Sequence, residues 1–170
     1  MSRLDSFIRR VSAQRDCLNM AAGLIADIPG PILELGLGNG RTFDHLRSLF
    51  PDREIFVFDR RVAAHPECIP DDNHMIVGDI TETLPAALDR IGGKAALAHC
   101  DIGTGEKESN ANLIATIAPM VNALMATGGI VCSDQEYTVA NWHAQPLPDG
   151  VNPGRYFINR VGDQQAAELC

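Results

Sequence analysis

The chain has 170 residues, 45% of them hydrophobic, and a formal net charge of −8 at pH 7. This length allows one domain with a substantial buried core, and no apolar run reaches the ~18 residues of a membrane span. The acidic balance argues against a nucleic-acid binder that works by broad neutralisation of phosphates.

Residues 1–29 are predicted to be helical. Leu4, Phe7, Ile8 and Val11 recur at helical spacing, and Cys17–Ile25 forms a second helix or a continuation of the first. The segment has no continuous apolar core like that of a signal peptide, so the cytoplasm is the expected location.

Five cysteines are spread along the chain without a Cys-x-x-Cys pair, at positions Cys17, Cys68, Cys100, Cys132 and Cys170. Their odd number and wide spacing indicate neither a zinc site nor a disulfide framework. Cys100 and Cys132 lie in apolar runs and are predicted to be small core residues rather than catalytic thiols.

Short apolar runs alternate with helical patterns through residues 31–134. The predicted strands are Ile32–Leu35, Ile55–Phe58, His74–Val77, Ala95–Cys100 and Ile130–Cys132. This alternation predicts an α/β fold, a doubly wound and mostly parallel sheet with helices on both faces. A carboxylate stands at or beside the end of each strand, at Glu34, Asp59, Asp79, Asp101 and Asp134. Ligands bind at this edge of such sheets, although some of the five acids are expected to be helix N-caps.

The pattern changes after Asp134. Residues 135–152 are rich in Pro, Gly, Asn and Gln, and only Arg155–Val161 reads clearly as a strand. We therefore expect a shortened C-terminal strand region, unless residues 135–143 supply a second strand. A bare sheet edge would favour a homodimer. The predicted organisation is a single domain, residues 1–170, with a cofactor-binding core at 31–134 and a C-terminal loop and strand at 135–170.

A glycine turn between the first strand and the next helix is the most informative motif. Gly36, Gly38 and Gly40 allow positive φ and let a ligand approach the main chain. A dinucleotide-binding turn would be Gly-x-Gly-x-x-Gly, but here the third glycine comes one place early and Arg41 stands in its position. Glu34, just before the turn, suits a ligand with an ammonium group better than one with a pyrophosphate.

The segment Glu-x-Gly-x-Gly-x-Gly, Glu34 to Gly40, resembles the first motif of the class I S-adenosylmethionine-dependent methyltransferases. Over about Pro31 to Asp134, further features agree in order with that family. They are Asp59 after the second strand, Gly78-Asp79-Ile80 after the third, His99-Cys100-Asp101-Ile102-Gly103 at the fourth, and Gly128-Gly129-Ile130-Val131 before and in the fifth.

The resemblance implies S-adenosylmethionine as cofactor and methyl transfer to a small molecule, at oxygen or nitrogen. It implies that Asp59 binds the ribose hydroxyls and that Asp79 lies near the adenine amine. An ionised Asp59 would bind a diol strongly. The expected cofactor-binding residues are Glu34, Gly36, Gly38, Asn39, Gly40, Asp59, Arg60, Gly78, Asp79, Ile80 and Asp101.

Methyl transfer is an in-line displacement that depends mainly on positioning, and a base helps only if the acceptor must lose a proton. His99 and Asp101 share one face of the fourth strand, so both are candidate catalytic residues. His99 is the first candidate base, and a purely structural histidine is the alternative.

Some O-methyltransferases of this class bind a divalent ion at the ends of the fourth and fifth strands. Asp101 and Asp134 occupy similar positions, with Glu136 nearby, so Mg²⁺ is a secondary possibility beside the main expectation of no metal. The N-terminal helices and the segment Trp142–His143 are candidate walls of the acceptor pocket, with Trp142 as core filler the alternative.

Two other functions stay open at this point. A binding protein could keep the cofactor pocket without turnover, as a short C-terminus would suggest. An NAD(P)-dependent oxidoreductase could use a similar sheet, although Arg41 counts against it. No nucleic-acid or membrane partner is expected.

Overall fold

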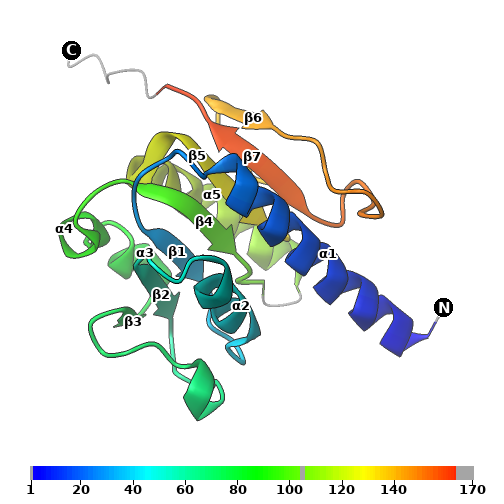
Figure 1. The fold of residues 1–170 in the computed structure, drawn as a ribbon, viewed down its shortest axis with the longest axis horizontal. Helices are drawn as coiled ribbons and strands as arrows, with labels where there is room; N and C mark the ends of the chain where they lie inside the picture. The colour runs from blue at the N-terminus through cyan, green and yellow to red at the C-terminus, as the bar shows by residue number, and fades with distance from the viewer. Residues whose placement is uncertain (1, 104–105, 164–170) are drawn as a thin grey trace.

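The computed structural model describes residues 2–103 and 106–163 (Figure 1). A seven-stranded sheet runs in the order β3-β2-β1-β4-β5-β7-β6, in which β1 to β5 are parallel and β6 and β7 are antiparallel. This arrangement confirms the predicted doubly wound α/β fold. The strands are β1 (Ile32–Leu35), β2 (Ile55–Asp59), β3 (Met75–Val77), β4 (Ala95–Cys100), β5 (Met125–Ser133), β6 (Trp142–Ala144) and β7 (Phe157–Val161). The helices are α1 (Arg3–Leu24), α2 (Arg41–Leu49), α3 (Ile80–Thr83), α4 (Ala87–Ile91) and α5 (Lys107–Leu124), with a 3-10 turn at Pro66–Cys68.

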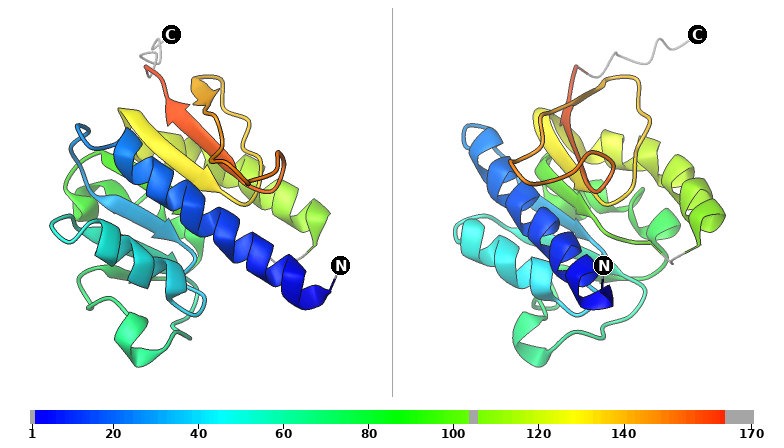
Figure 2. Two further views of the ribbon diagram at one scale, coloured as in Figure 1. Left: turned by 45° about the vertical axis from the view of Figure 1, so that its right-hand side comes forward. Right: turned by 90° about the vertical axis from the view of Figure 1, so that its right-hand side faces the viewer.

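Helices cover both faces of the sheet (Figure 2). Helices α1 and α2 pack on one face, around Leu18, Leu46 and the β1 residue Ile32. Helices α3, α4 and α5 pack on the other face, where Leu33 of β1 meets Ile117. Successive strand residues point to opposite faces, so each central strand is apolar along its whole length.

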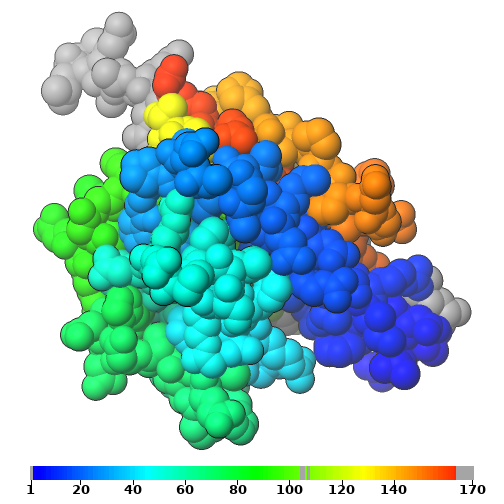
Figure 3. Space-filling view, in the orientation of Figure 1, coloured from blue at the N-terminus to red at the C-terminus, as the bar shows by residue number. Residues whose placement is uncertain are grey.

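The N-terminal residues form one long helix rather than two. Ser2 caps it, and the Asp5 side chain accepts a hydrogen bond from the Ser2 backbone N–H to complete a capping box. The first turns of α1 extend beyond the body of the molecule, and their apolar side chains, Leu4, Phe7 and Ile8, are 65%, 42% and 50% exposed. In the space-filling view, α1 and α2 lie side by side across one face (Figure 3).

The C-terminal region departs from the sequence prediction. Both antiparallel strands are present, so the strand region is not shortened. One of the two antiparallel strands, β6, has only three residues and includes the polar His143. Three residues are too few for an alternating pattern to be recognised in the sequence. The prediction of a homodimer depends on a missing strand. Because both strands are present, the structure gives no support to that prediction.

Two smaller features are the helices between β3 and β4 and the position of Trp142, a candidate wall of the acceptor pocket. The connection between β3 and β4 contains two short helices, α3 and α4, and Asp79 caps the first of them. Trp142 is a core residue: its ring stacks 5.6 Å from the Tyr137 ring, and its indole N–H donates to Asn122 Oδ1 at 2.7 Å. It lines neither of the two cavities that meet at the glycine turn.

Cys100 and Cys132 are buried, as predicted. Cys17 is buried as well, and Cys170 lies outside the described residues. Burial raises the pKa of Cys17 and of Cys100 to about 12, so both thiols stay protonated. Within the described ranges, no helix is long and apolar enough to cross a membrane.

Candidate functional site

The glycine turn after β1 packs directly on the end of β4. Gly36 has φ +100°, and a Cβ there would lie 2.4 Å from the Asp101 carbonyl oxygen. Gly40 has φ +83° and would place a Cβ 2.5 Å from the Cys68 Cβ. Gly38 differs because nothing lies within 4 Å of its Cβ direction, so its main chain faces open space. Only glycine satisfies this combination of backbone and close approach.

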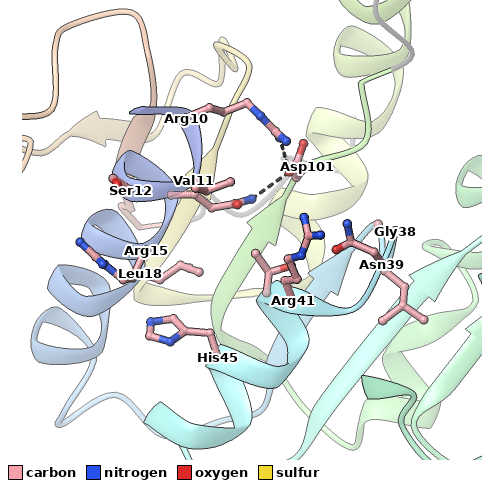
Figure 4. A pocket seen from close by; sticks show the side chains of 14 residues that line it. Arg10, Val11, Ser12, Arg15, Leu18, Gly38, Asn39, Arg41, His45 and Asp101 are labelled. Atoms are coloured by element: carbon pink, nitrogen blue, oxygen red, sulfur yellow. Dashed lines mark hydrogen bonds and ion pairs between the residues drawn. The ribbon is translucent and has the colours of Figure 1, made fainter. Parts of the chain in front are cut away.

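Two cavities meet at this turn, and they share Gly36, Gly38 and Asp101. The smaller, which we call the Asp59 cleft, has a volume of about 220 Å³ and lies over the ends of β1, β2 and β4. The larger, the α1–α2 groove, has a volume of about 490 Å³ and runs between the two helices (Figure 4). Asp101 therefore stands at the junction of the two cavities.

The Asp59 cleft combines the Asp59 carboxylate with largely apolar walls. The backbone N–H groups of Leu37 and Gly38 donate to Asp59 Oδ2 at 2.9 and 3.1 Å, which ties the glycine turn to the end of β2. The remaining wall is largely apolar and comes from Phe58, Ile80, Ile102 and Leu113. A flat ring flanked by hydroxyl groups fits such a surface.

A buried polar network lies beneath the site. Glu34 and His99 are register partners on β1 and β4, both are 0% exposed, and His99 Nδ1 lies 2.6 Å from Glu34 Oε2. The Thr42 hydroxyl donates to the other Glu34 oxygen, and the Tyr156 hydroxyl contacts His99 Nε2. Every polar group of this pair is thus satisfied by a side chain from another element.

The charge state of His99 follows from its neighbours. Burial alone disfavours the imidazolium, but the carboxylates of Glu34, Asp101 and Asp134 outweigh it and raise the pKa of His99 above 6.5. As an imidazolium, His99 donates from Nδ1 to Glu34 and from Nε2 to the Tyr156 hydroxyl. Its ring is then fully engaged within the fold.

Gln14 connects α1 to the junction of the two cavities. Its Nε2 donates to Asp101 Oδ2 at 2.8 Å and lies 3.4 Å from His99 Nε2. The Arg10 guanidinium, one turn earlier on α1, lies 3.7 Å from the same Asp101 oxygen. The Asp101 carboxylate is therefore held in place from one side and keeps 26% of its surface exposed toward the ligand spaces.

The residues expected from sequence divide into two groups. Those that line the cavities are Gly36, Gly38, Asn39, Asp59, Arg60, Gly78, Ile80 and Asp101. Those that line neither are Glu34, Gly40, Asp79 and His99. The Asp79 side chain is an N-cap that accepts from Thr81 N at 2.9 Å and pairs with Arg60. Glu34 and His99 are closed off beneath the junction.

The acids considered as metal ligands form an incomplete set. Burial, together with the neighbouring Asp101 charge, raises the pKa of Asp134, and its buried Oδ1 has no hydrogen-bond partner among the described residues. However, Asp101 already binds Gln14 and Arg10. No group of three His, Cys, Asp or Glu side chains in the described ranges could hold an ion. The residues present fit a metal poorly, so we derive no step through one.

Sequence reasoning missed the residues that α1 and α2 bring to the groove, namely Arg10, Gln14, Arg15, Thr42 and His45. One signal was available. Gln14 lies between the buried residues Ala13 and Cys17, on the buried face of a helix where a glutamine requires a polar partner.

Comparison with known proteins decides the family. A family model described as S-adenosyl-L-methionine methyltransferase matches residues 1–161. The chain belongs to this family.

A solved structure of the S-adenosyl-L-methionine methyl transferase from Silicibacter pomeroyi DSS-3 is 45% identical, covers 95% of this chain and 99% of its own, and has a TM-score of 0.89. The calicheamicin-pathway TDP-rhamnose 3'-O-methyltransferase CalS11 is 20% identical, with 95% and 82% coverage and a TM-score of 0.64. The mycinamycin-pathway methyltransferase MycE, solved with Mg and S-adenosylhomocysteine, is 15% identical, with 78% and 41% coverage and a TM-score of 0.53. A search of curated proteins found no match.

Family membership selects among the functions left open by the sequence. The protein is a class I S-adenosylmethionine-dependent methyltransferase, which removes the oxidoreductase and favours turnover over mere binding. CalS11 and MycE, each below 25% identity, add only that the fold is shared.

We predict that Glu34→Gln destabilises this methyltransferase in a pH-dependent way. A raised His99 pKa stabilises the fold fully below 6.5, and that stability is lost as pH rises through the folded-state pKa. Urea unfolding should therefore show a loss of about 1.5–3 kcal/mol at about pH 6, and the loss should shrink as pH rises through the folded-state pKa of His99. A larger loss at alkaline pH than at about pH 6 would contradict the charged pair. Glu67→Gln, which removes an exposed partner of His65, is the matched control.

We also predict that Asp59→Asn weakens binding of S-adenosylhomocysteine at least tenfold, or about 1.4 kcal/mol, in calorimetric titration. Asparagine keeps an acceptor oxygen for the Leu37 and Gly38 amides, so the turn stays folded while the charge is lost. Asp89→Asn, on the exposed surface of α4, should bind like the wild type. Unchanged affinity in Asp59→Asn would show that this carboxylate does not bind the cofactor.

Proposed function

We propose that this enzyme transfers the methyl group of S-adenosylmethionine to an oxygen or nitrogen atom of a small molecule held in the α1–α2 groove. The observation that carries the proposal is the meeting of two cavities at Gly36, Gly38 and Asp101. One cavity suits a nucleoside and the other is free for a second ligand, so the junction is where the two would react.

The Asp59 cleft would bind the nucleoside part of the cofactor. Asp59 would accept hydrogen bonds from the ribose hydroxyls, and Ile80, Ile102 and Leu113 would pack against the adenine. Arg60 and Gly78 line the same cleft, and Asp79 would act indirectly by capping α3. The open main chain at Gly38 would lie against the amino-acid part.

When bound, the cofactor supplies a methyl group on a sulfonium whose sulfur is a good leaving group. The chain therefore needs chiefly to align the acceptor. Asp101 lines both cavities, and we assign it the role of receiving the hydrogen bond, and finally the proton, of an acceptor O–H or N–H. Gln14 would fix the direction of that carboxylate, and the buried Glu34–His99 pair would hold the strand that carries it.

Size and charge favour a small acceptor. The groove volume of about 490 Å³ lies within the range of small-molecule sites, about 300–1,000 Å³. A net charge of −8 disfavours an RNA acceptor, because RNA binding relies on neutralising phosphates. No step of the proposed transfer uses Mg²⁺.

The proposal is tested by giving the enzyme isotopically methyl-labelled S-adenosylmethionine and a cell extract separated into small-molecule, RNA and protein fractions. We expect label in the small-molecule fraction, in an acid-stable product one methyl group heavier, with no loss on adding a chelator. Asp101→Asn should lower the labelling rate at least about 100-fold while S-adenosylhomocysteine still binds. Asp89→Asn is the control. Label in RNA or protein, or full activity in Asp101→Asn, would contradict the proposal.

A further inference from the structure

We propose that the methyl acceptor is an acidic small molecule whose carboxylate or phosphate group is bound by Arg10 and Arg41 in the α1–α2 groove. This inference rests on the proposed function, since it concerns the second of the two ligand spaces.

The groove is positively charged in an acidic protein. Three arginines line it, Arg10, Arg15 and Arg41, against the single carboxylate of Asp101. The net charge of the whole chain is −8, so the groove has the opposite sign of charge to the protein as a whole. Concentrated charge in a cavity selects ligands of the opposite sign.

Two of the guanidinium groups converge from different helices. Arg10 of α1 and Arg41 of α2 lie 5.6 and 5.9 Å from the centroid of the same Phe7 ring. Both extend toward Asp101 in the close view (Figure 4). Both guanidinium groups therefore lie near one aromatic ring, and the contact of each with that ring is favourable.

The three arginines of the groove differ in their carboxylate partners. Arg15 pairs with Asp16 at 2.9 Å, and Arg10 has only a long contact with Asp101, at 3.7 Å. Among residues 2–103 and 106–163, no carboxylate lies within ion-pair distance of Arg41. The Arg41 guanidinium, which has no carboxylate partner among the described residues, can therefore bind a carboxylate or phosphate of a ligand through two parallel hydrogen bonds.

The groove also contains one histidine, His45, whose charge state affects the balance. His45 is one turn from Arg41 on α2, and its Nε2 donates to Asn19 Oδ1 at 2.9 Å. Burial lowers the pKa of His45, and the Arg15 charge lowers it further. His45 is therefore neutral at pH 7 and does not add to the charge. Leu18 and Leu37 supply an apolar floor for the body of the ligand.

The cofactor itself does not neutralise this charge. S-adenosylmethionine carries a sulfonium, an ammonium and one carboxylate, so its net charge is positive. Binding it beside Asp101 leaves the groove more positive than before. An acceptor with an anionic group offsets that excess, and a neutral acceptor leaves it in place.

The test uses the full chain saturated with S-adenosylhomocysteine and three matched pairs of probes: benzoate and benzamide, phenylacetate and phenylacetamide, phenyl phosphate and phenol. In calorimetric or NMR titrations we expect at least one acid to bind about tenfold more tightly than its neutral partner. Arg41→Gln and Arg10→Gln should each reduce that preference to less than about threefold. Arg9→Gln and Arg47→Gln, on the same helices but outside the groove, should keep it.

Two results would overturn the inference. One is equal binding of acid and neutral partner, or no binding, for all three pairs. The other is a tenfold loss of S-adenosylhomocysteine affinity in Arg41→Gln with the preference for acids unchanged, which would assign the arginines to the carboxylate of the cofactor. Failure of the proposed function is separate, because it would appear as wild-type protein that binds no S-adenosylhomocysteine or labels only RNA or protein.

Discussion

The buried pair of Glu34 and His99 is the interaction on which the site depends. It joins β1 to β4 just below the glycine turn, and both side chains are 0% exposed. Each end of the pair is fixed from a different layer, Glu34 by Thr42 of α2 and His99 by Tyr156, beside β7. A buried charge without a partner costs several kcal/mol, so these elements must assemble together. The position of Asp101, two residues beyond His99, is a consequence of that assembly.

The long N-terminal helix turns this framework into a binding site. Gln14 reaches from α1 to Asp101, and the same helix contributes Arg10 to the rim of the groove. The Asp59 cleft is thereby joined by a second cavity, which the proposed function assigns to the acceptor. Under the proposed function, α1 and α2 would determine specificity for the acceptor, and the ends of β1, β2 and β4 would recognise the cofactor. This division lets the acceptor groove vary without changes in the Asp59 cleft.

The fold, and several residues that line the Asp59 cleft, could be predicted from the sequence because their signals are local. Apolar runs, the glycine spacing and an acid after each strand all lie within short windows. Asp59 lines a cleft, and its binding to the ribose stays a prediction. The acceptor end could not be predicted, since Arg10 and Arg41 meet only when two helices pack on one face. Residue type alone also gave a wrong expectation of which polar side chains are exposed to a ligand. Glu34 and His99 carry reactive groups, but register partnership directs both beneath the surface, where they bind each other.

A crystal structure of the complex with S-adenosylhomocysteine tests the central claim most directly, that two ligand spaces meet at Asp101. We predict that the adenosine lies in the Asp59 cleft with its ribose hydroxyls on Asp59. The sulfur should lie beside Asp101, and the groove between Arg10 and Arg41 should stay open to a second ligand. A complex in which the amino-acid part of the ligand fills that groove, with its carboxylate on both arginines, would contradict the account.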